Sequence, residues 1–246
     1  RRLVERSDVV VENFRSAVKQ RLGLTYEALS TVNPRVILAS ISGFGQTGPY
    51  SDRPGLDQIV QGMCGLSSVT GEPGRGPWRA GIAISDTTSG MFLGQGILLA
   101  LLHRERTGRG QWVHTSLLES MLNQMDFQAA RYTVDGHVPG QEGNAHPTLA
   151  PMGTYDAKDG KVNIGGPGAA MWARLCEALG APQLAADPRY IDLAARMKNR
   201  AALEAEINAV TRLHTVADLV DRLNRAGVPS GPVYDIDAFD DDVYLV

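Results

Sequence analysis

The chain has 246 residues, of which 43% are hydrophobic and 21% are charged, and its net charge at pH 7 is -3. Such a composition is typical of an ordinary globular protein with one large or two modest domains. The charge argues against nucleic-acid binding, and no apolar run reaches the roughly 18 residues that a membrane helix needs. We therefore expect a cytoplasmic protein with no nucleic-acid or membrane partner.

The two cysteines, Cys64 and Cys176, lie far apart in the sequence. Neither belongs to a CxxC motif, and neither has a histidine at the spacing typical of metal ligands. We expect two buried or half-buried free thiols in a reducing compartment, and no metal site.

Residues 1–42 predict two buried strands joined by a helix. Continuous β-branched or apolar runs cover residues 8–13 and 35–42, and residues 17–32 between them carry leucines at helical spacing. A strand-helix-strand order favours a right-handed crossover and a parallel sheet. The segment Asn13-Phe14-Arg15 then lies at the carboxyl end of the first strand, where open α/β sheets bind their ligands.

A Gly-rich turn at residues 42–49 follows the second strand. It is neither a GxGxxG motif opening a helix nor a Walker A loop, so it does not predict dinucleotide or ATP binding. A tight connection and a bare backbone kept for a ligand both fit it. Residues 58–67 predict the next helix, for which Asp57 is a candidate N-cap.

A single aspartate, Asp86, stands at the start of a long helical pattern. It follows a Gly/Pro-rich loop at 71–79 and a short apolar run at 80–85, and it precedes apolar residues at helical spacing up to Gly108. We expect Asp86 at or beside the helix N-cap, where the helix dipole favours the ionised carboxylate. An ordinary capping role and a catalytic role both fit. Three glycines in the helix, each costing about 1 kcal/mol relative to alanine, favour the close approach of a ligand.

The remainder of the chain predicts a change of architecture. A strand at 111–116 and a helix at 117–131 are followed by a linker, in which His146 is interpreted as structural. A hairpin around residues 158–160 and three amphipathic stretches then indicate a smaller α+β domain. We expect a large α/β domain at 1–135, a linker at 136–151 and a small α+β domain at 152–246.

Three segments together resemble the class III CoA-transferases, the family of formyl-CoA transferase and carnitine CoA-transferase. They are residues 9–50, residues 71–122, which contain the SDTTSG motif around Asp86, and the GVPSGPVYDI motif at 227–236. The resemblance covers nearly the whole chain. It implies a Rossmann-like open parallel sheet with helices on both faces, an interlocked homodimer, and a chain that is an internal fragment of a longer protein.

The resemblance also implies the roles of particular residues. Asp86 matches the nucleophilic aspartate of the family, and Asp57 matches an acidic residue near it. Burial beside another carboxylate raises the pKa of one member of such a pair. Asn13, Phe14 and Arg21 match positions that contact CoA, and the adjoining Arg15 is a further candidate, because guanidinium groups suit phosphate oxygens. Trp78, Met91 and Tyr155 are candidates for one wall of the acyl pocket.

The expected activity is transfer of CoA from an acyl-CoA to a free carboxylic acid through an aspartyl-CoA thioester at Asp86. We expect no tightly bound cofactor, since the CoA thioester is the substrate, and we expect backbone N–H groups at residues 88–90 to stabilise the oxyanion. One alternative is an acyl-CoA racemase of the same fold, disfavoured because Leu56 stands where racemases carry a proton-transferring histidine. The other is a catalytically inactive CoA-binding homologue.

Overall fold

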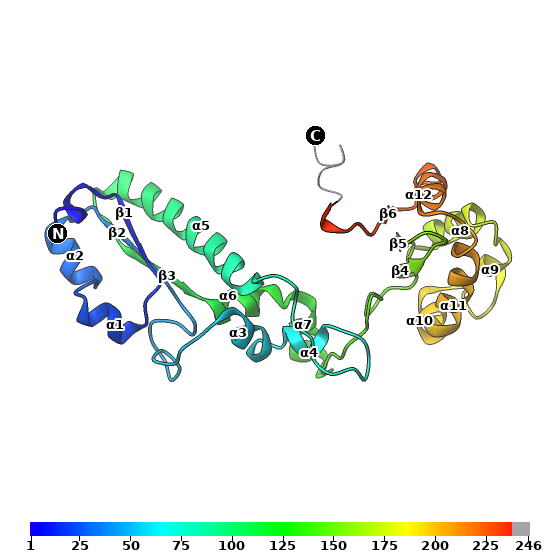
Figure 1. Cartoon of the computed structure of the whole chain (residues 1–246), viewed down its shortest axis with the longest axis horizontal. Helices are drawn as coiled ribbons and strands as arrows, with labels where there is room; N and C mark the ends of the chain where they lie inside the picture. The colour runs from blue at the N-terminus through cyan, green and yellow to red at the C-terminus, as the bar shows by residue number, and fades with distance from the viewer. Residues whose placement is uncertain (238–246) are drawn as a thin grey trace. The chain divides into compact units, whose positions relative to one another are not determined.

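The computed structural model describes residues 1–237 of the chain (Figure 1). Two compact units make up the chain, the first comprising Arg1–Gln141 and the second beginning at Glu142. Within residues 1–237, no helix is long and apolar enough to cross a membrane. The domain boundaries that we expect at residues 135 and 152 stay a prediction.

The first unit contains the predicted parallel sheet. Its strands are β1 (Val9–Glu12), β2 (Ile37–Ser42) and β3 (Trp112–Ser116), in the spatial order β1-β2-β3. All pairings are parallel, with Val11 opposite Ala39 and Ser42 opposite Ser116. The carboxyl ends of the three strands therefore meet at one edge of the sheet.

Two helices connect β1 to β2 where the sequence predicts one. The short 3₁₀ helix η1 (Val4–Arg6) precedes β1, and α1 (Ser16–Arg21) and α2 (Tyr26–Val32) follow it. The predicted helix is broken because Gly23 adopts a left-handed φ of 67° and Thr25 caps α2 by accepting the N–H of Ala28.

A long crossover connects β2 to β3. It contains α3 (Asp57–Met63), α4 (Leu66–Val69) and α5 (Ile84–Thr107). Gly65, at a φ of 94°, separates α3 from α4, and α5 ends as predicted at the left-handed Gly108. Residues 80–85 form no strand. Figure 1 shows α5 on the opposite side of the sheet from α1 and α2, so helices cover both faces.

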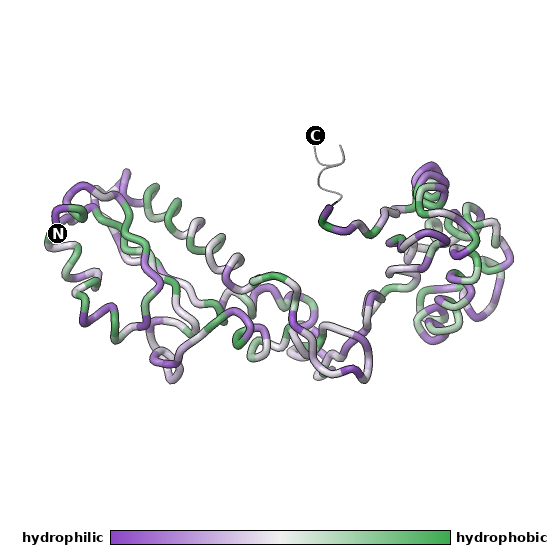
Figure 2. The backbone as a smooth tube through the Cα atoms, in the orientation of Figure 1, coloured by the Kyte–Doolittle hydropathy of each residue, from purple (hydrophilic) through white to green (hydrophobic). Residues whose placement is uncertain are grey.

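One side of α5 buries Leu93 and Ala100, but other apolar side chains of this helix are exposed. Figure 2 shows hydrophobic colouring along much of α5. The exposed members are Met91, Leu98, Leu99 and Leu102.

After β3 come α6 (Leu117–Gln124) and α7 (Asp126–Asp135), which replace the single helix predicted at 117–131. The break falls at Asp126, whose φ is 41°. Ser116 caps α6 by accepting the N–H of Glu119. Helices α3 and α6 share a small apolar cluster that includes Val60 and Met121.

The second unit is built on an antiparallel sheet with helices packed against it. The predicted hairpin is formed by β4 (Met152–Asp156) and β5 (Lys161–Gly165), and the sequence did not predict the third strand, β6 (Ser230–Pro232). Up to residue 237 this unit also contains five helices, where the sequence predicts three: α8 (Ala169–Ala178), α9 (Gln183–Ala186), α10 (Leu193–Lys198), α11 (Arg200–Thr211) and α12 (Val216–Arg225).

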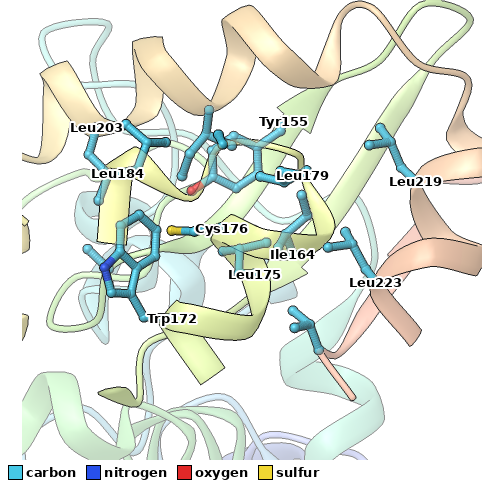
Figure 3. Close-up of a cluster of buried hydrophobic side chains, with 14 of the residues drawn as sticks. Tyr155, Ile164, Trp172, Leu175, Cys176, Leu179, Leu184, Leu203, Leu219 and Leu223 are labelled. Atoms are coloured by element: carbon cyan, nitrogen blue, oxygen red, sulfur yellow. The ribbon is translucent and has the colours of Figure 1, made fainter. Parts of the chain in front are cut away.

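An apolar core fills the space between this sheet and its helices (Figure 3). Trp172, Cys176 and Leu203 are among its buried side chains. Both cysteines are buried and free, as expected. Burial raises the pKa of the Cys176 thiol to about 12, so this thiol is a packing group rather than a nucleophile.

Candidate active site

The first turn of α5 lies at the carboxyl edge of the parallel sheet. The hydroxyl of Ser89 donates to the carbonyl of Ser85, at 2.6 Å, and lies 3.4 Å from the carbonyl of Ser116, the last residue of β3. Since Ser85 and Ser89 flank Asp86, these contacts hold Asp86 at the edge where open α/β sheets bind ligands.

Asp86 is the third residue of α5, and its side chain is exposed. The N-cap is Ala83, so Asp86 lies in the first turn of the helix and does not have the capping role that its position in the sequence also allowed. Partial desolvation, and then the negative charge of Asp57, raise the pKa of Asp86 above its usual value. This direction is opposite to the one expected from the helix dipole alone. In the described part of the chain, no group donates a hydrogen bond to this carboxylate.

Asp57 is the first residue of α3, and the N-cap is Leu56. The carboxylate of Asp57 does not cap its own helix but binds the start of α5. Its Oδ1 accepts the backbone N–H of Ser85 at 2.9 Å and the Ser85 hydroxyl at 2.7 Å. Its Oδ2 accepts the Gln61 amide at 2.7 Å. The two predicted acids are thus joined through Ser85, the residue before Asp86.

The two carboxylates have opposite pKa shifts. Desolvation opposes the ionisation of Asp57, but the hydrogen bonds from Ser85 and Gln61, helped by the charge of Arg79, outweigh it and lower its pKa. Asp57 is therefore held ionised, and its charge acts on Asp86. One acid is fully hydrogen-bonded, whereas the other is available to a substrate.

Gln61 is a site residue that sequence analysis missed. Its side chain is fully buried. Besides donating to Asp57, it donates to the carbonyl of Ile82 at 3.2 Å and accepts the N–H of Ala80 at 2.8 Å. The signal available in the sequence was a polar residue four positions after Asp57, which places both side chains on one side of α3.

The four candidate CoA-binding residues lie together after β1. Asn13, Phe14, Arg15 and Arg21 are all exposed, and Arg15 is the N-cap residue of α1. The buried Glu12 accepts the N–H of Phe14 at 2.7 Å, which fixes the turn leaving β1. Asn13, Phe14 and Arg15 therefore lie at the same edge of the sheet as the first turn of α5, whereas Arg21 is the last residue of α1.

A buried polar cluster supports this turn, and the sequence analysis did not identify it. The Lys19 ammonium lies 3.7 Å from Glu12, 2.5 Å from the Gln46 carbonyl oxygen and 4.1 Å from the centre of the Trp112 ring. Burial lowers the pKa of Lys19, and Glu12 opposes this shift. Lys19 thereby ties α1 to the Gly-rich turn that contains Gln46.

The three candidates for an acyl-pocket wall belong to different elements. Trp78 lines a hollow beside α3, and Met91 is exposed on α5. Tyr155 is buried in the apolar core of the second unit. Across residues 1–237, no group of three or more acidic, histidine or cysteine side chains is arranged to hold a metal ion.

The chain is similar to known CoA-transferases along most of its length. A family model described as CoA-transferase family III matches residues 1–245. The chain is 40% identical over 235 residues to acetyl-CoA:oxalate CoA-transferase of Acetobacter aceti, covering 95% of this chain and 60% of that protein. It is 38% identical over 237 residues to succinate–glutarate CoA-transferase of Agrobacterium fabrum, covering 96% of this chain and 59% of that protein.

A solved structure shares the fold. The crystal structure of a CAIB/BAIF family protein from Brucella suis superposes with a TM-score of 0.84 at 40% identity, covering 98% of this chain and 64% of that one. The chain thus spans about 60% of the length of the curated relatives that it matches. On the match of the family model over nearly all of its residues, the chain belongs to CoA-transferase family III.

Proposed function

We propose that the protein containing this chain transfers CoA from an acyl-CoA to a free carboxylic acid, with Asp86 as the nucleophile. The observation that carries the proposal is the contrast between two neighbouring acids. Asp57 is bound by Ser85 and Gln61, whereas the exposed Asp86 carboxylate accepts no hydrogen bond from the described residues. The names of its relatives, which include oxalate, succinate and glutarate, support acid acceptors for this chain.

The reaction proceeds by exchange between anhydrides and thioesters. Asp86 attacks the thioester carbonyl, forming a mixed anhydride and releasing the CoA thiolate. The thiolate then attacks the carbonyl of Asp86, which releases the first acid as a carboxylate and leaves an aspartyl-CoA thioester. The acceptor carboxylate attacks that thioester, and the thiolate attacks the acceptor's carbonyl, so that the Asp86 carboxylate is restored with no net proton transfer.

The raised pKa of Asp86 suits this chemistry, because a more basic carboxylate is a better nucleophile once ionised.

The backbone N–H groups that can stabilise the oxyanion differ from those expected from the sequence. Because α5 begins at Ile84, the N–H groups of residues 88–90 are used inside the helix, and the expectation that they bind the oxyanion is wrong. Asp57 takes the N–H of Ser85, and Ala83 takes that of Thr87. Among residues 1–237, nothing accepts the backbone N–H of Asp86, which leaves this group as a donor for the oxyanion.

CoA binding is assigned to the turn after β1. Arg15 begins α1 at the same edge of the sheet as Asp86, and Arg21 ends this helix; both are exposed, and guanidinium groups bind phosphate oxygens through paired hydrogen bonds. Asn13 and the exposed Phe14 complete the candidate surface.

We further propose that the protein forms an interlocked homodimer, which the exposed apolar side of α5 supports. We also propose that it is cytoplasmic and that it holds no tightly bound cofactor.

One experiment separates the three candidate activities. The full-length protein is incubated in deuterated water with succinyl-CoA and isotopically labelled glutarate, and a parallel sample receives a chiral 2-methylacyl-CoA in place of succinyl-CoA. Transfer predicts labelled glutaryl-CoA. Deuterium at the α-carbon of a chiral 2-methylacyl-CoA without acid exchange would instead establish a racemase, and CoA binding without either product would establish an inactive homologue.

A further inference from the structure

A hollow of about 580 Å³ lies between α3 and the loop before α5, and it has no role in the steps described above. Its lining comes from α3 and from the loop before α5: Gln58, Gly62, Ser67, Pro77, Trp78 and Arg79. Gln58 follows Asp57 in the sequence, and Gly62 follows Gln61. The hollow therefore adjoins the hydrogen-bond network that places Asp86, and its volume accommodates a small organic acid.

Arg79 is the charged residue among those that line the hollow. Its side chain is exposed, and its Nε donates to the carbonyl of Ala80 at 3.0 Å. Among the described residues, nothing accepts a hydrogen bond from its two terminal nitrogens, and no carboxylate forms an ion pair with it. The end of the guanidinium that suits bidentate binding is thus available.

The backbone on both sides of Arg79 is fixed. The N–H of Trp78 donates to the carbonyl of Ser67 at 3.1 Å, and the N–H of Ala80 donates to Gln61 at 2.8 Å. The second of these bonds ends on the same amide that binds Asp57. The position of Arg79 is therefore set by the network that positions the two acids, and its backbone requires no ordering when a ligand binds.

The chemistry of the hollow matches one end of a substrate. A guanidinium binds a carboxylate through two parallel hydrogen bonds. The side chains of Gln58 and Ser67 add neutral donors, and the indole of Trp78 adds an apolar wall. The charge of Arg79 acts on Asp57, so this guanidinium lies near the acid pair. An acid with two carboxylates can place one of them on Arg79 while the other reacts.

We propose that Arg79 determines which acid is used, by binding the second carboxylate of a small dicarboxylic acid in this hollow. The inference rests on the proposed CoA transfer at Asp86 and assigns the residue that selects the acid. Arg79 is a specificity-determining residue here, and the Asp86 carboxylate remains the nucleophile.

The test is a competition between two acids of equal chain length. The full-length protein receives succinyl-CoA with equal concentrations of labelled glutarate and labelled valerate, and the ratio of the two initial product rates gives the ratio of their kcat/KM values. Because both acids draw on the same donor step, effects on that step cancel. The unaltered protein should favour glutarate, and Arg79→Gln should reduce that preference by about 10- to 100-fold, as expected for a lost hydrogen-bonded charge.

A matched control lies in the same loop. Arg75 is paired with Glu72 at 3.3 Å and does not line the hollow, so Arg75→Gln should leave the product ratio unchanged.

A second variant, Gly62→Leu, places a side chain in the hollow at a position where an added Cβ meets no heavy atom within 4 Å. It should reduce the use of glutarate more than that of the shorter succinate. An Arg79→Gln variant that is slower but keeps the product ratio would overturn the proposal, since Arg79 would then act only through Asp57.

Calorimetric titration with glutarate separates this inference from the proposed function. Glutarate binding that weakens at least tenfold in Arg79→Gln, in a protein that transfers no CoA, would support the binding role while contradicting the transfer activity. Equal glutarate and valerate affinities in the unaltered protein would overturn the binding role, whatever the transfer assay shows.

Discussion

The two units of the chain bury different kinds of side chain. In the second unit the core is apolar, and Arg196 and Thr211 are the buried polar residues among those described. In the first unit the apolar clusters are small, and buried polar residues are numerous, including Glu12, Lys19 and Gln61. The difference shows that the first unit uses buried positions to place a site, whereas the second uses them for packing.

Arg196 and Asp57 illustrate the two uses. The guanidinium of Arg196 is buried and donates to the carbonyls of Ala150, Pro167 and Tyr190. All three of these acceptors are backbone carbonyls of the second unit, so Arg196 functions as a structural group. The network around Asp57 ends instead beside a carboxylate that no described residue binds, which leaves one reactive group facing outward.

The largest effect should come from Asp86→Ala. Removal of the nucleophile should reduce CoA transfer by several orders of magnitude, because no other side chain can form the thioester. The exposed side chain contributes little to packing, so the melting temperature should change little. The assay is CoA transfer with circular dichroism in parallel. Glu72→Ala, which removes another exposed acid of the first unit, is the control and should keep full activity.

In the second unit, the corresponding large effect is on stability. Leu203→Ala should lower the free energy of unfolding by about 2–5 kcal/mol, because it leaves a cavity in the apolar core. Denaturant unfolding monitored by Trp172, in the same core, measures this change. A loss below about 1 kcal/mol would mean that this core is loosely packed.

Gln61→Leu should affect both properties by an intermediate amount. It leaves the N–H of Ala80 and one oxygen of Asp57 without their partner, at a cost of about 1–3 kcal/mol. We expect kcat to fall while KM for the acyl-CoA is nearly unchanged, because the CoA-binding turn lies on another element. Asn208→Leu removes a comparable side-chain amide in the second unit, and it should cost stability without lowering kcat.

The smallest effect should be a shift in pH dependence. The reacting Asp86 must be ionised, and its pKa is raised, so activity should fall as the pH drops through a value above that of an ordinary aspartate. Asp57→Asn removes the negative charge that contributes to this rise, so the acidic limb should move to lower pH. The measurement is kcat/KM against pH. An unmoved limb would show that Asp57 does not act on Asp86.

Much of the architecture of both units was predictable because their strands, crossovers and turns have clear sequence patterns. The parallel sheet, the end of α5 at Gly108 and the hairpin at residues 158–160 follow from local sequence. Helix breaks at Gly23, Gly65 and Asp126 did not, since a left-handed residue interrupts each apolar pattern without changing its period. Strand β6 was missed because it is short and contains a proline.

Asp57 and Asp86 were identified from their positions at predicted helix starts and from the resemblance to class III CoA-transferases, but their interactions were not. Capping was the alternative role for each, whereas the carboxylate of Asp57 crosses to α5 and binds Ser85. That contact depends on how α3 and α5 pack against each other, which no local pattern specifies. Gln61 was missed for the same reason: its partners Ala80 and Ile82 lie about 20 positions away.

The central claim is that CoA becomes covalently attached to Asp86. The most direct measurement incubates the full-length protein with succinyl-CoA, traps the product with hydroxylamine and maps the modified peptide by mass spectrometry. A hydroxamate on Asp86, absent without succinyl-CoA, is the predicted result. An unmodified Asp86 in a protein that is transferring CoA under the same conditions would contradict the account.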